Sequence, residues 1–160
     1  MAYLLDANVF IDAKNRYYRF GVCPGFWDWL VYAHEEGLLL SVKQVRDELL
    51  DRGDKLSLWC RTHRKLFVDT NDGKTFDSMK SLSAWVAQNY QPAAQAKFLG
   101  DADFALVAFA EAYSHTVVTN EVPSGGFEVK IPNACKWMDV PVISPFQMLT
   151  DQKVKLVLSK

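Results

Sequence analysis

The chain has 160 residues, 49% of them hydrophobic and 23% charged, which is typical of a globular protein that buries one sizeable core. Its 18 basic and 19 acidic residues leave a net charge of −1, which excludes a globally basic surface, so any contact with RNA must use a local basic patch. Three cysteines without a CxxC pair argue against a disulfide framework or a zinc knuckle. With no secretory signal and no long apolar run, we expect one cytoplasmic domain over residues 1–160, without a membrane span.

The first structural element is a short apolar run at residues 3–5, closed by Asp6 and followed by Asn8. The run is too short for a helix and does not alternate, so it predicts a strand that is buried on both faces. Asp6 then lies at the carboxyl end of this strand, where open α/β sheets bind their ligands. A carboxylate buried there needs a hydrogen bond, a charged partner or a cation. A plain helix cap or turn residue is the alternative role for Asp6.

Apolar runs and helical patterns alternate through the first half of the chain. We expect a short helix at residues 8–14, a longer helix at 24–36 and a second strand at 38–40. Ser41 and Gln44 form a capping-box pattern, which predicts a helix that runs to about Arg52. A further helix at 55–65 precedes a third strand at 66–69.

The second half continues this alternation. Residues 75–90 form an amphipathic helical pattern, Pro92 interrupts it, and the almost wholly apolar stretch 104–113 predicts a helix buried against a sheet. A fourth strand at 116–119, a loop or small hairpin at 123–132, a short helix at 133–138 and a fifth strand at 141–143 follow, and Ser144 with Pro145 opens a last helix. Five strand–helix alternations predict an α/β protein whose parallel sheet is covered by helices on both faces.

Four acids lie at or near the predicted carboxyl ends of strands, or on helices beside them: Asp6, Glu48, Asp103 and Glu121. Carboxylates that converge without basic partners repel one another. A hard cation such as Mg²⁺ or Mn²⁺ removes this conflict, because it prefers oxygen ligands. One or two such ions can activate water and stabilise a phosphodiester under in-line attack. The residue types therefore allow metal-dependent phosphodiester hydrolysis.

Two neighbouring acids leave a choice within this set. Asp101 and Asp103 are two residues apart on a predicted helix and do not share a face, so we expect one to cap the helix while the other points inward. Asp47 stands beside Glu48, and we choose Glu48 because its spacing from the adjacent apolar residues suits a position that flanks the core.

Four segments of the chain then carry a specific resemblance. They are Leu4-Leu5-Asp6-Ala7-Asn8, Val45-Arg46-Asp47-Glu48-Leu49, the run from Asp103 to Ala110, and Val117-Val118-Thr119-Asn120-Glu121. In this order they resemble the PIN-domain ribonucleases, many of which are toxins of bacterial toxin–antitoxin pairs, and the match spans nearly the whole chain. The stretch from Lys130 to Cys135 is similar to a less characterised PIN-like branch.

The resemblance implies a three-layer α/β/α fold with a five-stranded, mostly parallel sheet in the order 3-2-1-4-5. It also implies a Mg²⁺ or Mn²⁺ site in which Asp6, Glu48, Asp103 and Glu121 are both the metal ligands and the catalytic residues. Glu121 departs from the family pattern, in which the last acid is usually Asp. The implied function is an endoribonuclease that cleaves single-stranded RNA, with a cognate antitoxin as its protein partner.

Supporting roles can be assigned to further residues. We expect Asn8, Asp101, Thr119 and Asn120 to orient the acids, because ligating carboxylates need hydrogen-bond partners of their own. A local basic patch for RNA would consist of Lys14, Arg16, Lys43, Arg46 and Arg52. Aromatic residues at positions 17, 18 and 20 are interleaved with this patch and can stack on bases, or they are buried in the core. Apolar helices, including residues 26–31, offer surface for a homodimer.

Two other functions fit parts of the pattern. A phospho-acceptor receiver domain is also doubly wound and would use Asp69, at the end of the third strand, as the phosphorylated residue. Strand order separates the two folds, since Asp69 is remote from Asp6 in the order 3-2-1-4-5 but lies on a neighbouring strand in a receiver. The third possibility is a PIN-like module that binds RNA or protein without cutting.

Overall fold

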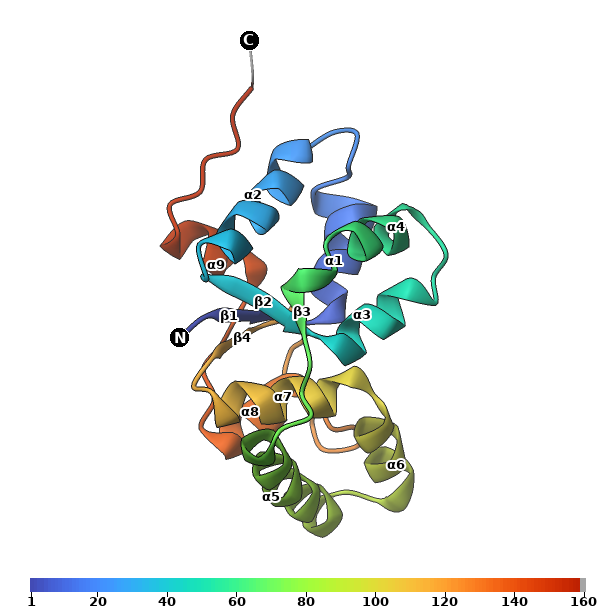
Figure 1. The fold of residues 1–160 in the computed structure, drawn as a ribbon. Helices are drawn as coiled ribbons and strands as arrows, with labels where there is room; N and C mark the ends of the chain where they lie inside the picture. Colours follow the sequence, from blue (N-terminus) through green and yellow to red (C-terminus); the bar gives the residue numbers. More distant parts are fainter. Residues whose placement is uncertain (159–160) are drawn as a thin grey trace.

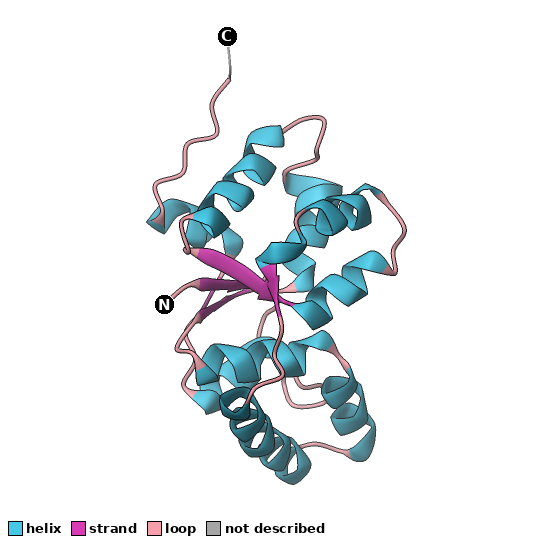
Figure 2. Ribbon diagram, in the orientation of Figure 1, coloured by secondary structure: helices cyan, strands magenta, loops and turns pink. Residues whose placement is uncertain are grey.

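Five short strands form one parallel sheet in the order β3-β2-β1-β4-β5 (Figure 2). The structure is a computed structural model and describes residues 1–158. The strands are β1 (Tyr3–Leu5), β2 (Leu39–Val42), β3 (Phe67–Val68), β4 (Thr116–Val118) and β5 (Val142–Ile143). The predicted α/β class, with a five-stranded parallel sheet in the order 3-2-1-4-5, is therefore confirmed.

Helices cover both faces of this sheet, which gives three layers (Figure 1). On one side lie α1 (Ala7–Asp12), α2 (Pro24–Glu35), α4 (Lys55–Thr62) and α9 (Pro145–Asp151). On the other side lie α5 (Gly73–Asn89), α6 (Pro92–Gly100), α7 (Ala102–Ala112) and α8 (Ile131–Met138). Helix α3 (Lys43–Leu50) follows β2 directly, a π-helical turn, η1 (Ala13–Tyr17), extends α1, and a 3₁₀ turn, η2 (Arg64–Leu66), leads into β3.

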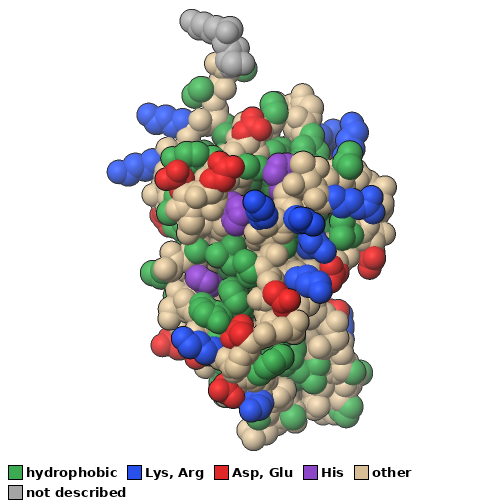
Figure 3. All heavy atoms as spheres, in the orientation of Figure 1, with side chains coloured by type: hydrophobic (Ala, Val, Ile, Leu, Met, Phe, Trp, Pro, Cys, Tyr) green, Lys and Arg blue, Asp and Glu red, His purple; other side chains and the backbone are tan. Residues whose placement is uncertain are grey.

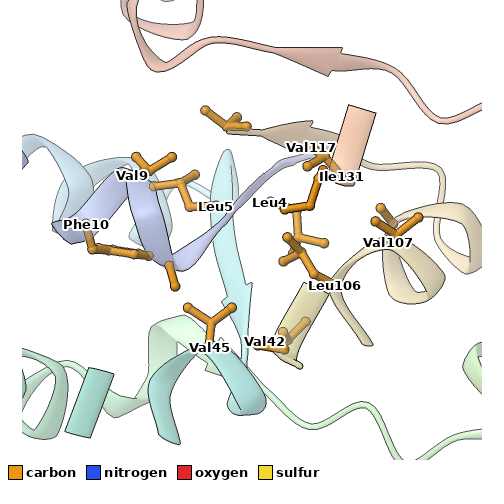
Figure 4. Packing of buried hydrophobic residues seen from close by; sticks show 14 of the residues in the cluster. Leu4, Leu5, Val9, Phe10, Val42, Val45, Leu106, Val107, Val117 and Ile131 are labelled. Carbon is orange, nitrogen blue, oxygen red and sulfur yellow. The ribbon is translucent and has the colours of Figure 1, made fainter. Parts of the chain in front are cut away.

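The core is packed against both faces of β1. Alternate residues of a strand point to opposite faces, so Leu4 lies among Leu106 and Ile131, while Leu5 faces Val9 of α1 (Figure 4). Every residue of α7 from position 105 to 110 is buried, which explains why this helix is apolar almost all round. Because helices bury both faces of the sheet, a ligand can reach it at the carboxyl ends of the strands.

Side-chain caps begin three of the helices. At the start of α4, the Asp54 carboxylate accepts a hydrogen bond from the Ser57 N–H at 3.1 Å. The Ser57 Oγ in turn accepts one from the Asp54 N–H at 3.3 Å. Asp72 caps α5, which was not predicted. Ser144 caps α9 with Pro145 in the first turn, as predicted.

Two local predictions were wrong, and one helix was missed. Ser41 does not begin a capping box, because β2 extends to Val42 and the Ser41 Oγ donates to the Leu5 carbonyl oxygen of β1 at 2.6 Å. Pro92 does separate two helices, since α5 ends at Asn89, but the helix α6 that begins at Pro92 was not predicted. The apolar residues at positions 26, 27 and 30 of α2 are buried in the chain's own core, so they provide no surface for a dimer.

Strand order also decides against the receiver fold. Asp69 follows the edge strand β3, and β2 lies between β3 and β1, so Asp69 is two strands away from Asp6. A phospho-acceptor site cannot form between these two residues. In the described part of the chain, no helix combines the length and the apolar character that a bilayer crossing requires.

Candidate metal and nuclease site

The predicted acids meet at the carboxyl end of the central strands. Tyr3 and Leu4 of β1 pair with Leu39 and Leu40 of β2, and Leu5 pairs with Val118 of β4. The residues that follow these strands are therefore neighbours. Asp6, Glu48, Asp103 and Glu121 all line one pocket, together with Asn8 and Asp101. The structure thus brings together the four acids that the sequence singled out.

Asp6 is the deepest of the four and is held by Thr119. Its side chain is almost fully buried, with 1% of the residue surface exposed. The Thr119 Oγ1 donates a hydrogen bond to Asp6 Oδ2 at 2.8 Å and accepts one from the Glu121 N–H at 3.0 Å. Thr119 therefore fixes the carboxylate of Asp6 and the backbone of Glu121 at once, which is the orienting role expected of it.

Burial is the main cause of the raised pKa values of the acids in this pocket, and the neighbouring carboxylates add to it. Burial raises the pKa of Asp6 from 3.8 to about 7, against the lowering effect of the Thr119 hydrogen bond, and the Glu121 charge raises it further. Burial also raises the pKa of Asp103 to about 8, with the charges of Asp6 and Glu121 adding to the effect. The pKa of Glu48 is raised as well, by partial desolvation and by the Asp101 charge. All-oxygen donors in this state fit a hard divalent cation, which would restore their charged forms.

Glu121 has partners that the other acids lack. Its Oε2 accepts a hydrogen bond from the N–H of Ile131, the first residue of α8, at 2.8 Å. Its Oε1 lies 3.9 Å from the Lys130 Nζ. The expectation that the acids have no basic partner is therefore wrong for Glu121, because Lys130, in the loop before α8, also lines the pocket.

Of the two pairs of neighbouring acids, Asp47 and Glu48 take the expected positions, whereas Asp101 does not cap the helix through its side chain. Asp101 occupies the N-cap position of α7 but its side chain makes no capping hydrogen bond, and it lines the pocket instead. Asp103, in the first turn of the same helix, is half-buried at the pocket. Glu48 lines the acidic pocket, whereas Asp47 lies outside it and pairs with Arg46 at 3.7 Å.

Asn8 and Asn120 differ in their placement. Asn8 lines the acidic pocket from the first turn of α1. Asn120 does not orient the acids, because its side-chain amide donates to Asp12 Oδ2 at 2.9 Å. This bond ties the end of β4 to α1.

The predicted basic patch does not form as one surface. Lys14 and Arg52 both pair with Asp54, at 2.8 and 3.5 Å, on the side of α4. Lys43 is exposed at the start of α3, and Arg46 pairs with the adjacent Asp47. On the face drawn in Figure 3, basic side chains gather in the upper half, near α4 and β3, and both signs mix below.

Arg16 is the member of that patch that reaches the site. It lines a groove that shares Glu121 with the acidic pocket, along with Tyr17 and Phe146. The rings of Tyr17 and Phe146 meet edge to face with their centroids 5.1 Å apart, and both residues are close to half exposed. Tyr18 instead stacks on the buried Phe26, so the interleaved aromatics divide between groove and core.

Three charged residues at the pocket were missed by the sequence analysis: Lys97, Glu128 and Lys130. Lys97 comes from the unpredicted helix α6, and the other two come from the irregular segment between β4 and α8. No periodicity marks Lys97 or Glu128, because only the tertiary fold brings them to the acids. Lys130 begins the stretch that is similar to a PIN-like branch, and this was the one signal that could have found it.

In residues 1–158, the acids of the pocket are not close enough together to coordinate one metal ion. Across the described part of the chain, no group of three or more His, Cys, Asp or Glu residues is arranged so that it could hold such an ion. Thr119 holds Asp6 through Oδ2, and the Ile131 N–H holds Glu121 through Oε2. A cation would have to draw the side chains together.

The sheet order and the helical layers define a protein of the PIN-like α/β fold. This fold is similar to that of one chain in the crystal structure of VapBC2 from Rickettsia felis, with a TM-score of 0.58. In that structure VapBC2 is bound to a DNA fragment from its promoter. The match covers 90% of this chain and 98% of that chain at 16% sequence identity. A family model described as "Domain of unknown function (DUF4411)" matches residues 3–156, so the chain belongs to that family. No curated protein matches it.

Proposed function

We propose that this protein is a Mg²⁺- or Mn²⁺-dependent endoribonuclease that hydrolyses single-stranded RNA. The observation that carries the proposal is the convergence of Asp6, Glu48, Asp103 and Glu121 in one pocket at the carboxyl end of β1 and β4. Their residue type, the burial of Asp6 and the raised pKa values of Asp6 and Asp103 fit a site that binds a cation.

The four acids act together in this proposal. Asp6, Glu48, Asp103 and Glu121 would hold the ion, and a bound Mg²⁺ or Mn²⁺ would polarise the scissile phosphate and lower the pKa of a water molecule. Thr119 orients Asp6 through its 2.8 Å hydrogen bond. The groove beside Glu121, with its exposed Tyr17–Phe146 pair and Arg16, offers stacking and charge for an unpaired strand.

The biological role we propose is that of a toxin with a cognate antitoxin and an assembly as a homodimer. The likeness to a VapBC2 chain supports this role at the level of fold. The antitoxin would place a segment over the acidic pocket. Expression of the wild-type chain should arrest growth, and expression of Asp6→Asn should not. Light scattering tests the dimer, since a monomer at all micromolar concentrations would count against it.

The deciding experiment compares wild type, Asp6→Asn and Asp69→Asn on a pool of RNA, with Mn²⁺ and with EDTA. Asp6→Asn keeps the shape of the side chain but removes its charge, so cleavage should be lost. Asp69 is exposed and distant from the pocket, so Asp69→Asn should cleave like the wild type. Cleavage that survives both EDTA and Asp6→Asn would rule out the mechanism. A chain that binds RNA but never cuts it would instead be a binding module.

A further inference from the structure

Two lysines share one carboxylate at the acidic pocket. The Lys97 Nζ, on α6, lies 3.1 Å from Glu128 Oε1. The Lys130 Nζ lies 3.1 Å from Glu128 Oε2. All three residues line the same pocket as Asp6 and Glu121. The two oxygens of Glu128 thus bridge two ammonium groups that come from different parts of the fold.

A phosphodiester offers the same pattern of charge. Its two non-bridging oxygens share one negative charge and accept hydrogen bonds from ammonium groups, as a carboxylate does. We propose that Lys97 and Lys130 form a phosphate subsite for the backbone of single-stranded RNA, which Glu128 occupies in the free protein and leaves when RNA binds. This inference rests on the proposed function, because it concerns the substrate of the same site.

The position of the subsite suits this ligand. Lys130 also lies 3.9 Å from Glu121 Oε1, so a phosphate between the two lysines would be next to the acids that we propose as metal ligands. Of the described residues that line this pocket, Lys97 and Lys130 are the cationic ones. Lys14 and Arg52, by contrast, are paired with Asp54 beside α4 and away from the pocket.

The ion pairs of Glu128 with Lys97 and Lys130 contribute little to the stability of the fold, so a phosphate can replace Glu128 at low cost. The Lys97 and Glu128 side chains are 61% and 50% exposed, and exposed ion pairs contribute little to stability. The backbone nearby is anchored independently, since the Ser124 Oγ donates to the Glu128 carbonyl oxygen at 2.8 Å and the Ser124 N–H donates to Asn133. Glu128 can therefore release both lysines by a side-chain rotation alone.

The test measures binding of a short fluorescein-labelled oligouridylate by fluorescence anisotropy over a range of salt. The 160-residue chain is used in an Asp6→Asn background with EDTA, so that binding is separated from cleavage. Adding Glu128→Gln should tighten binding about threefold to tenfold, because the competing anion is removed. Adding Lys97→Met should weaken binding and lower the slope of log K against log salt by about 0.7, the value for one phosphate contact on a single strand. Lys97→Arg should restore most of the affinity.

A matched control separates the subsite from a general effect of charge. Asp77 pairs with Lys80 at 3.2 Å on the exposed surface of α5, so Asp77→Asn removes one negative charge from a similar ion pair outside the pocket. It should change RNA affinity less than Glu128→Gln does. Equal effects of these two variants, together with an unchanged salt slope in Lys97→Met, would overturn the subsite. Failure of the parent chain to bind the oligouridylate at any salt would overturn it too.

The subsite and the nuclease can fail separately. If the lysine and glutamate variants change binding as expected but the wild-type chain never cleaves RNA with Mn²⁺, the subsite stands and the nuclease is refuted. If the wild type cleaves RNA while all the variants bind like the Asp77→Asn control, the nuclease stands and the subsite is refuted.

Discussion

The burial of Asp6 makes a quantitative prediction about the stability of the metal-free protein. In the unfolded chain the carboxyl titrates near 3.8, and in the folded protein its pKa is about 7. An acid whose folded pKa is raised contributes stability below its unfolded pKa, and that stability is lost as the pH rises through the folded value. The wild type should therefore become less stable between about pH 4 and pH 7 in EDTA, while Asp6→Asn should not lose this contribution.

The size of the effect follows from the shift. A change from 3.8 to about 7 corresponds to about 4 kcal/mol of unfolding free energy, since each pKa unit is worth 1.36 kcal/mol. Between about pH 5 and pH 8 the expected part is about 3 kcal/mol, because Asp6 is largely protonated at the lower pH and ionised at the higher one. The unfolding free energy of Asp6→Asn minus that of the wild type should grow by this amount across the window.

Urea denaturation followed by fluorescence, at several pH values with EDTA, measures this difference. Asp28→Asn, at an exposed position of α2, is the matched control and should give a difference that does not vary with pH. Adding Mn²⁺ at the upper pH should stabilise the wild type by mass action and leave Asp6→Asn unchanged. A difference between Asp6→Asn and wild type that stays flat with pH would refute the account of the buried charge.

Three further changes test other parts of the structure. Thr119→Val removes the hydroxyl that favours the charged form of Asp6, so the pKa of Asp6 should rise further and the chain should lose about 1–3 kcal/mol of stability at alkaline pH, measured by urea denaturation. If Thr119→Val is as stable as wild type at that pH, the hydrogen bond from Thr119 does not stabilise the charged form of Asp6. Leu106→Ala should cost about 2–5 kcal/mol, because Leu106 is fully buried on α7, and thermal unfolding at low pH and at neutral pH should show the same loss. Asp54→Ala removes the cap of α4 and the partner of Lys14, which should cost about 1 kcal/mol or more, whereas Asp54→Asn keeps the cap and should cost less; equal melting temperatures would contradict the capping argument.

Local sequence features predicted much of the fold. The apolar run that ends at Asp6 had to be a buried strand, because only a strand of a doubly covered sheet is so short and so uniformly apolar. The apolar stretch within α7 is longer than a strand of this sheet, and a helix that is apolar on all sides is buried in the core. Turn and cap residues such as Ser144 with Pro145 act within a few positions, so their effect is readable from the chain alone.

Local signals were misleading where a tertiary partner competed for the same group. Ser41 has the side chain of a helix cap, but the Leu5 carbonyl oxygen, 36 residues away, takes its hydrogen bond. Asn120 was expected to serve the acids, and Asp12, 108 residues away, holds it instead. Pro92 marks both the break after α5 and the start of α6, and the short helix α6, which packs against α7, had no clear local pattern of its own.

The sequence by itself determined that buried strands alternate with helices and that their ends carry acids, because burial and capping depend on neighbouring residues. The tertiary structure alone decided which groups meet there. Asp6 and Thr119 are 113 residues apart and touch because β1 and β4 are adjacent. Lys97 and Glu128, 31 residues apart, meet because α6 and the loop before α8 reach the same pocket. Such contacts depend on strand order and loop path, which are set by the packing of the whole chain and leave no periodic mark in it.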